Sequence, residues 1–90
     1  MGMANIKRYQ LIEKAIRKAG VENIKTYMLK NGYRTDKFDR DIALIKYCLQ
    51  HGPTATSKIF HLSLTSSSYI VRRYYKFALE TIEEMEKERR

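Results

Sequence analysis

The chain has 90 residues, with 18 lysines and arginines against 10 acidic residues and a formal net charge of +8. A chain of this length folds as one small domain, which leaves little room for a deep enzyme cleft. The surplus of positive charge favours an anionic partner, of which nucleic acid is the usual one. A single cysteine, Cys48, excludes an internal disulfide and is typical of a reducing compartment. No apolar run approaches the ~18 residues of a membrane span, so we expect a cytoplasmic protein that contacts no membrane and is nucleoid-associated in a bacterial host.

Apolar residues recur at spacings of three and four along the chain, without the alternation of a strand. This pattern predicts an all-α protein, a compact bundle of about five helices. The first helix is expected over residues 5–18, with Asn5 as its N-cap and Gly20 as a left-handed stop. The second is expected over residues 22–30, with Gly32 closing it. The side chains expected to face inward from these two helices are Ile6, Tyr9, Ile12, Ile16, Ala19, Ile24, Tyr27 and Met28.

The third helix has the clearest pattern, and we expect it over residues 36–50 with Asp36 as its N-cap. Asp39 and Asp41 fall in its first turns, where the helix dipole favours anions. The dipeptide Gly52-Pro53 is expected to end it. Its apolar side chains step by four, three and four residues and are Phe38, Ile42, Ile45 and Leu49.

A short fourth helix is expected over residues 55–61, with Ile59 and Phe60 buried. A turn at residues 62–64 then leads into a long fifth helix, which is capped by Thr65 or Ser66 and runs to about residue 87. At ~1.5 Å per residue this last helix would span about 36 Å, which is longer than so small a core needs. We therefore expect one domain over residues 1–90. Its parts are an N-terminal helical pair (1–34) and a scaffold helix, helix-turn-helix and C-terminal extension (35–90).

The fifth helix is expected to bury one stripe and to expose a basic one. The predicted buried stripe consists of Val71, Tyr75, Ala78, Ile82 and Met85. At ~100° per residue, the opposite side carries Ser66, Tyr69, Arg73 and Lys76, with Arg72 on the flank. Residues 53–79 hold four basic side chains and no acidic one. An α-helix fits the major groove of B-DNA, where arginine suits guanine and serine or threonine reaches a base or a phosphate oxygen. The alternative is an unspecialised, solvated basic face.

The stretch GPTATSKIFHLSLTSSSYIVRRYYKFALE, residues 52–80, resembles a helix-turn-helix domain: a supporting helix, a turn and a recognition helix. With the following KFALETI, residues 53–82 are also similar to small phage- and prophage-encoded regulators of the ArpU type, which are related to the DNA-binding region 4 of sigma factors. The turn HLSLTSSS departs from that pattern because it contains no glycine. The resemblance implies duplex DNA as the partner. The residues expected to contact it are Thr54, Thr56, Lys58, Ser66, Ser67, Ser68, Tyr69, Arg72, Arg73 and Lys76.

Two other groups of residues invite a chemical interpretation. Cys48, His51 and His61 contain metal-ligating atoms, but a structural zinc site requires four ligands at set spacings. The serine run 66–68 offers hydroxyl nucleophiles, but catalysis requires a base and an orienting group beside them. We therefore expect no metal, no cofactor and no enzymatic activity.

The expected function is that of a non-enzymatic transcription regulator of phage or prophage type, which reads duplex DNA with the helix starting near Thr65. A homodimer through the C-terminal helix would use Ile82 and Met85 as its seam and would match a two-fold operator. The alternative is a helical interaction module that binds an acidic protein such as a polymerase subunit. A small DNA-packaging protein of the terminase-small kind lies between the two. Both alternatives predict DNA binding that is driven by charge alone.

Overall fold

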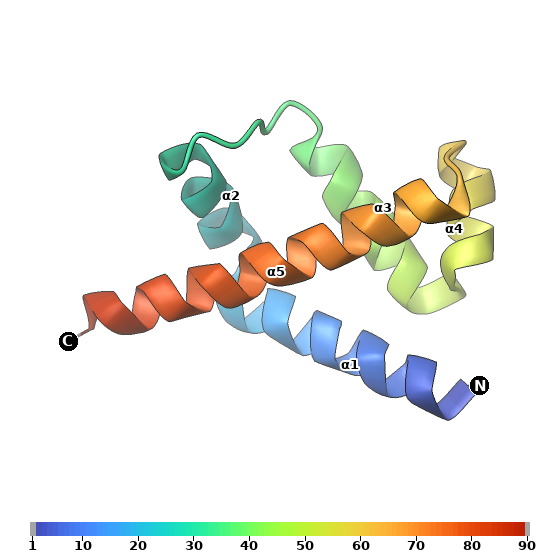
Figure 1. Cartoon of the computed structure of the whole chain (residues 1–90), viewed down its shortest axis with the longest axis horizontal. Coiled ribbons are helices and arrows are strands. Elements are labelled where there is room, and N and C mark those ends of the chain that lie inside the picture. The colour runs from blue at the N-terminus through green and yellow to red at the C-terminus, as the bar shows by residue number, and fades with distance from the viewer. Residues whose placement is uncertain (1, 90) are drawn as a thin grey trace.

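The computed structural model describes the backbone of residues 2–89 and the side chains of residues 7–89. Over this range the chain is all-α, as predicted, with a long C-terminal helix (Figure 1). None of the helices in the described part combines the length and the apolar character needed to cross a membrane. The five helices are α1 (Gly2–Ala19), α2 (Val21–Lys30), α3 (Phe38–His51), α4 (Pro53–Phe60) and α5 (Leu64–Glu88).

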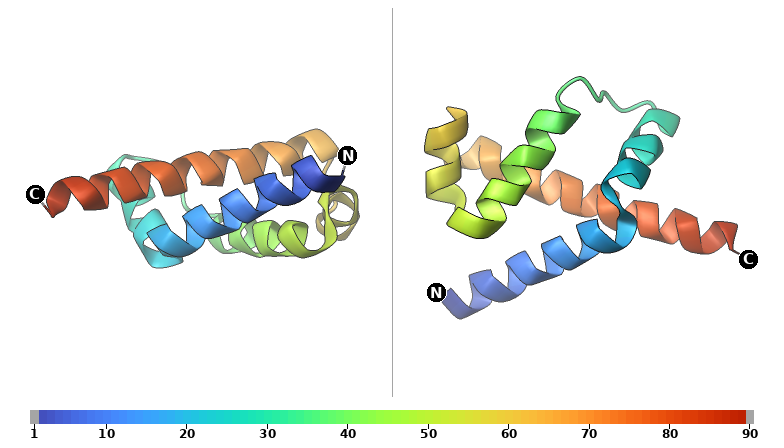
Figure 2. Two further views of the ribbon diagram at one scale, coloured as in Figure 1. Left: turned by 90° about the horizontal axis from the view of Figure 1, so that it is seen from below. Right: turned by 180° about the vertical axis from the view of Figure 1, so that it is seen from behind.

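The long helix α5 organises the fold because it packs against each of the other four helices. It runs along one side of the molecule from end to end (Figure 2). The first turns of α1 and α5 lie at the same end of the molecule as α4 and the last turns of α3 (Figure 1). The Cα atoms extend over 41 × 30 × 16 Å, so the molecule is flat, and the described side chains on one face of α5 are exposed.

The buried side of α5 differs from the predicted one. Tyr74 and Phe77 are 2% and 3% exposed, whereas Tyr75, Ile82 and Met85 are only half-buried. At ~100° per residue, the buried stripe is rotated by roughly 60° from the predicted one. Val71 and Ala78 are common to both. The full buried set of α5 is Ser67, Val71, Tyr74, Phe77, Ala78 and Thr81.

The rotation of α5 has a physical cause in α3. The Tyr74 hydroxyl donates to Asp41 Oδ2 at 2.9 Å, and Arg40 pairs with the other carboxylate oxygen at 2.7 Å. The Tyr74 ring also packs against Phe38, with 5.9 Å between centroids. A buried tyrosine needs a hydrogen-bond partner, and α3 offers one to Tyr74. Asp41 therefore contributes more than the favourable dipole interaction that its sequence position predicts.

Three predicted N-caps are wrong. Asn5 lies inside α1, which continues back to Gly2 through Met3 and Ala4, both good helix formers. Asp36 precedes α3, whose N-cap is Lys37 without a side-chain bond, and Asp36 instead pairs with Arg34 at 3.5 Å. The cap of α5 is neither Thr65 nor Ser66, because the Ser63 Oγ accepts the Ser66 amide at 3.0 Å. The predicted stops at Gly20, Gly32 and Gly52 are confirmed, since each has a positive φ.

The short helix α4 also differs from its predicted phase. It begins at Pro53 rather than Ala55, and Thr56, not Ile59, is its fully buried side chain. Ile59 is 57% exposed, while Phe60 is half-buried against the core. A spacing of four from Thr56 to Phe60 turns one face of α4 inward, and Ile59 lies outside that face.

A non-glycine residue makes the turn between α4 and α5. His61 adopts the left-handed conformation, with φ 57° and ψ 44°, which is uncommon for a residue with a Cβ. The Leu62 amide donates to the Ser57 carbonyl at 3.0 Å, as in the Schellman stop that glycine usually makes. The reversal takes only residues 61–63, so α5 starts earlier than its sequence predicts.

We expect His61→Gly to stabilise the protein by about 1 kcal/mol, because glycine removes the backbone strain at a small entropic cost. Gly52→Ala is the opposite control, since an added Cβ meets no atom within 4 Å but φ is +87°. That substitution should destabilise by about 1–3 kcal/mol through backbone strain alone. Urea unfolding measures both. A loss of stability in His61→Gly would show that the imidazole makes a contact worth more than the strain.

Candidate nucleic-acid interface

Segments that contain basic residues and no acidic ones meet at one end of the described molecule. Residues 42–79 run from the second turn of α3 through α4 and the first two thirds of α5, and they contain no aspartate or glutamate. The first turns of α1 lie at the same end (Figure 1) and add two further cations before the first acid, Glu13. The basic residues of this end are Lys7, Arg8, Lys46, Lys58, Arg72, Arg73 and Lys76. We call this region the basic end.

The exposed face of α5 at the basic end is centred on Arg72. Tyr69 is 57% exposed, and Lys76 is exposed with only a 4.0 Å contact to Glu80. Arg73 is half-buried instead, with its guanidinium carbon 5.2 Å from the centroid of the Phe77 ring. The predicted order of the two arginines is therefore reversed: Arg72 lies at the centre of the face and Arg73 on its flank. The exposed residues of the face are Thr65, Ser66, Ser68, Tyr69, Arg72 and Lys76.

A shallow depression of about 470 Å³ lies along this face. Its lining combines three cations with aromatic rings. One of the aromatic residues, Tyr33, comes from the loop between α2 and α3, and the centroid of its ring lies 4.7 Å from that of Phe77. Tyr69 could be predicted from the sequence as a contact residue, but Tyr33 could not, because only the tertiary fold brings that loop onto α5. The lining residues are Tyr33, Tyr69, Arg72, Arg73, Lys76 and Phe77.

Two of the predicted contact residues are wrong, because their side chains are fully buried. The Thr56 hydroxyl donates to the Gly52 carbonyl at 2.7 Å. The Ser67 hydroxyl lies 3.2 Å from that of Ser57 and joins α5 to α4. Both side chains stabilise the helix pair and cannot reach a ligand. Of the other predicted residues, Arg73 is half-buried, and the exposed ones are Thr54, Lys58, Ser66, Ser68, Tyr69, Arg72 and Lys76.

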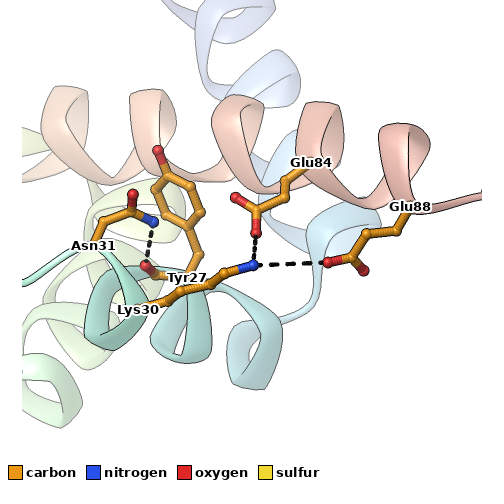
Figure 3. Close-up of polar contacts among 5 residues, drawn as sticks. All are labelled: Tyr27, Lys30, Asn31, Glu84 and Glu88. Atoms are coloured by element: carbon orange, nitrogen blue, oxygen red, sulfur yellow. Dashed lines mark hydrogen bonds and ion pairs between the residues drawn. The ribbon is translucent and has the colours of Figure 1, made fainter.

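The C-terminal part of α5 is acidic, and one side of it lies against α2 (Figure 3). Lys30 Nζ lies 2.6 Å from Glu84 Oε1 and 3.9 Å from Glu88 Oε1. The Tyr27 hydroxyl donates to Glu80 Oε1 at 2.5 Å. Part of the predicted overhang thus packs against its own chain, and the proposed dimer seam is half-buried there at Ile82 and Met85, whereas residues 86–89 are exposed.

The contact between Tyr27 and Glu80 makes stability depend on alkaline pH. The hydrogen bond to Glu80, then burial, raises the pKa of Tyr27 from 10.0 to about 12. Burial, then the bond to Asp41, also raises the pKa of Tyr74. A raised pKa means that the unfolded chain loses the proton first, so this stability is complete below pH 10 and is lost as the pH rises to about 12.

We expect Tyr27→Phe to be less stable than the parent protein at neutral pH by about 1 kcal/mol, the value of one hydrogen bond. The two free energies of unfolding should converge as the pH rises from 10.0 to about 12, and urea unfolding at a series of pH values measures this. Tyr69→Phe is the control, since Tyr69 is exposed on the other half of α5. A constant gap between Tyr27→Phe and the parent at every pH would contradict the proposed role of the Glu80 contact.

The groups considered for metal binding are dispersed. Cys48 is buried, and His51 is exposed with its ring 4.4 Å from that of Tyr47. Within residues 2–89, no three histidine, cysteine or acidic side chains are grouped so as to hold a metal ion.

The chain matches no protein-family model, and neither a curated protein nor a solved structure matches it.

Proposed function

We propose that this chain is a non-enzymatic protein that binds duplex DNA through the first half of α5, as a transcription regulator of phage or prophage type. The observation that carries the proposal is the basic end, where the exposed face of a helix coincides with a region free of acidic residues. A helix of this kind suits the major groove. Its cations neutralise phosphates and release counterions, which supplies affinity. The hydroxyls of Ser66 and Ser68 are small enough for bases to approach the helix closely.

A second candidate function is binding to an acidic protein surface, and one observation favours it. Large apolar side chains are exposed close to the cations of the basic end: Ile59 (57%), Leu64 (50%) and Leu79 (46%). Apolar contacts of this kind contribute to protein interfaces rather than to contacts with phosphate. A small DNA-packaging protein would combine this surface with charge-driven DNA binding.

The first experiment measures binding to a random pool of duplex DNA by fluorescence anisotropy at several salt concentrations. The double variant Arg72→Ala/Lys76→Ala should lower the affinity for all sequences and reduce the slope of log K against log salt by about 1.8, since each phosphate contact contributes about 0.9. The matched control is Lys87→Ala/Arg89→Ala, which removes the same charge from the acidic end. Equal effects of the two double variants would show that the basic end is not the DNA site.

Sequencing of the bound DNA then separates the candidate functions. A regulator enriches one sequence that keeps its advantage at the higher salt concentration, and the length and symmetry of that site distinguish a monomer from a dimer. Binding without enrichment that collapses with salt supports the interaction module or the packaging protein instead.

A further inference from the structure

Arg72 also lines a second hollow, of about 280 Å³, where α1 meets the other helices of the basic end. Arg8 projects to it from α1, and Ser68 stands one turn before Arg72 on α5. Pro53, the first residue of α4, adds the positive end of a helix dipole. The full lining is Arg8, Tyr9, Cys48, Pro53, Ser68, Val71 and Arg72.

The two guanidinium groups have no acidic neighbour in this hollow. The lining contains no aspartate or glutamate. Among the described side chains, neither Arg8 nor Arg72 forms an ion pair, although other arginines, such as Arg17 and Arg40, do. Like charges that face a common space repel each other, and an anion bound between them attracts both and offsets the repulsion.

The hollow also has the donors and the room that a phosphate requires. Guanidinium groups donate in a fork that matches phosphate oxygens, and the Ser68 hydroxyl is a further donor. Burial raises the pKa of the half-buried Tyr9, so its phenol keeps its proton. A volume of about 280 Å³ is several times the ~30 Å³ of a water molecule.

We propose that this hollow binds one backbone phosphate of the DNA, held by Arg8 and Arg72 with Ser68. The inference rests on the proposed function and extends it to α1, which gains a direct contact with DNA. Because Arg72 lines both this hollow and the depression on α5, a phosphate held here lies next to the face of α5 that approaches the groove. Contacts of this kind fix the register of a protein on the duplex.

The first test compares Arg8→Ala with Lys18→Ala in binding to duplex DNA. Lys18 carries the same charge in the last turn of α1, but it lies outside the basic end and does not line the hollow. Arg8→Ala should weaken binding about tenfold and reduce the salt slope by about 0.9. Lys18→Ala should leave the slope unchanged. Equal effects of the two substitutions would overturn the phosphate site and leave the proposed function standing.

A second test uses inorganic phosphate in place of DNA. Phosphate should raise the thermal unfolding midpoint of the parent protein more than chloride of equal ionic strength does, and Arg8→Ala should abolish the difference. This result without any DNA binding supports the anion site but overturns the proposed function and the assignment to a DNA phosphate. No difference between phosphate and chloride, together with a normal salt slope in Arg8→Ala, overturns the site.

A third test puts a carboxylate into the hollow. Ser68→Asp should raise the thermal midpoint, because the new side chain occupies the place of the anion between Arg8 and Arg72, and it should weaken DNA binding. The gain in midpoint should shrink in the Arg8→Ala background. An equal gain in both backgrounds would show that Arg8 does not face Ser68 and would overturn the proposal.

Discussion

Replacing Phe77 by alanine is expected to lower the free energy of unfolding by about 3–5 kcal/mol, whereas Tyr75→Ala should lower it by only about 1–2 kcal/mol. Phe77 is 3% exposed and its ring lies 4.7 Å from that of Tyr33 and 5.7 Å from that of Tyr74. Its loss leaves a cavity where the loop between α2 and α3 meets α5. Tyr75 is half-buried at the edge of the core, so solvent fills the space that it leaves.

Urea unfolding of the two variants therefore tests the rotation of α5 directly. Phe77→Leu is the control, since it keeps most of the volume and should cost less than about 1.5 kcal/mol. It also remains measurable if Phe77→Ala does not fold. A larger loss from Tyr75→Ala than from Phe77→Ala would place the buried stripe where the spacing of apolar residues predicts it.

Phe77→Ala should also perturb the candidate interface. The ring of Phe77 packs against Tyr33 and against the guanidinium of Arg73, and all three residues line the depression on α5. The same side chain thus links the core to the surface. A fall in DNA affinity in the folded Phe77→Leu variant would follow from movement of these two neighbours.

The helices were predictable because their signals are local. Spacings of three and four mark amphipathic helices, and glycines with positive φ stop them at Gly20, Gly32 and Gly52. The phase of α5 was not predictable, because apolar side chains cover more than half of its circumference. The choice between Tyr74 and Tyr75 is decided by Asp41 and Phe38 on α3, which are distant in the sequence.

The start of α5 was ambiguous for a related reason. Ser63, Thr65 and Ser66 are all competent N-caps, and the sequence alone does not rank them. The left-handed backbone of His61 decides among them, since it reverses the chain early enough for Ser63 to cap. Histidine carries a much weaker signal for this conformation than glycine does.

The candidate site divides in the same way. The lack of acidic residues in positions 42–79 can be recognised from the sequence, because the composition of a segment does not depend on the fold. The burial of the Thr56 and Ser67 hydroxyls cannot be recognised from the sequence, since Thr54 and Ser68 are residues of the same types in the same short segments. The contributions of Tyr33 and Arg8 to the two hollows depend on the packing of other helices against α5.

Arg72→Ala is expected to weaken binding to duplex DNA by about 1–3 kcal/mol on every sequence and to reduce the salt slope by about one, because we propose that Arg72 binds a phosphate. Arg73→Ala should cost less than about 0.5 kcal/mol, although the two residues are adjacent and carry the same charge. The difference arises because Arg73 is half-buried and its guanidinium lies over the Phe77 ring. Anisotropy titrations with a selected and a random duplex, at two salt concentrations, measure both variants.

Arg72→Lys distinguishes the two ways in which this arginine can contact DNA. Lysine also binds phosphate, but it lacks the planar fork that recognises guanine. If Arg72 binds the backbone, the lysine variant recovers most of the affinity on both duplexes. If affinity returns on the random duplex alone, Arg72 reads a base. Arg8 would then have to hold the phosphate in the neighbouring hollow without Arg72. A larger loss of DNA affinity in Arg73→Ala than in Arg72→Ala would contradict the rotation of α5. In that case Tyr75→Ala would also have to destabilise the protein more than Phe77→Ala does.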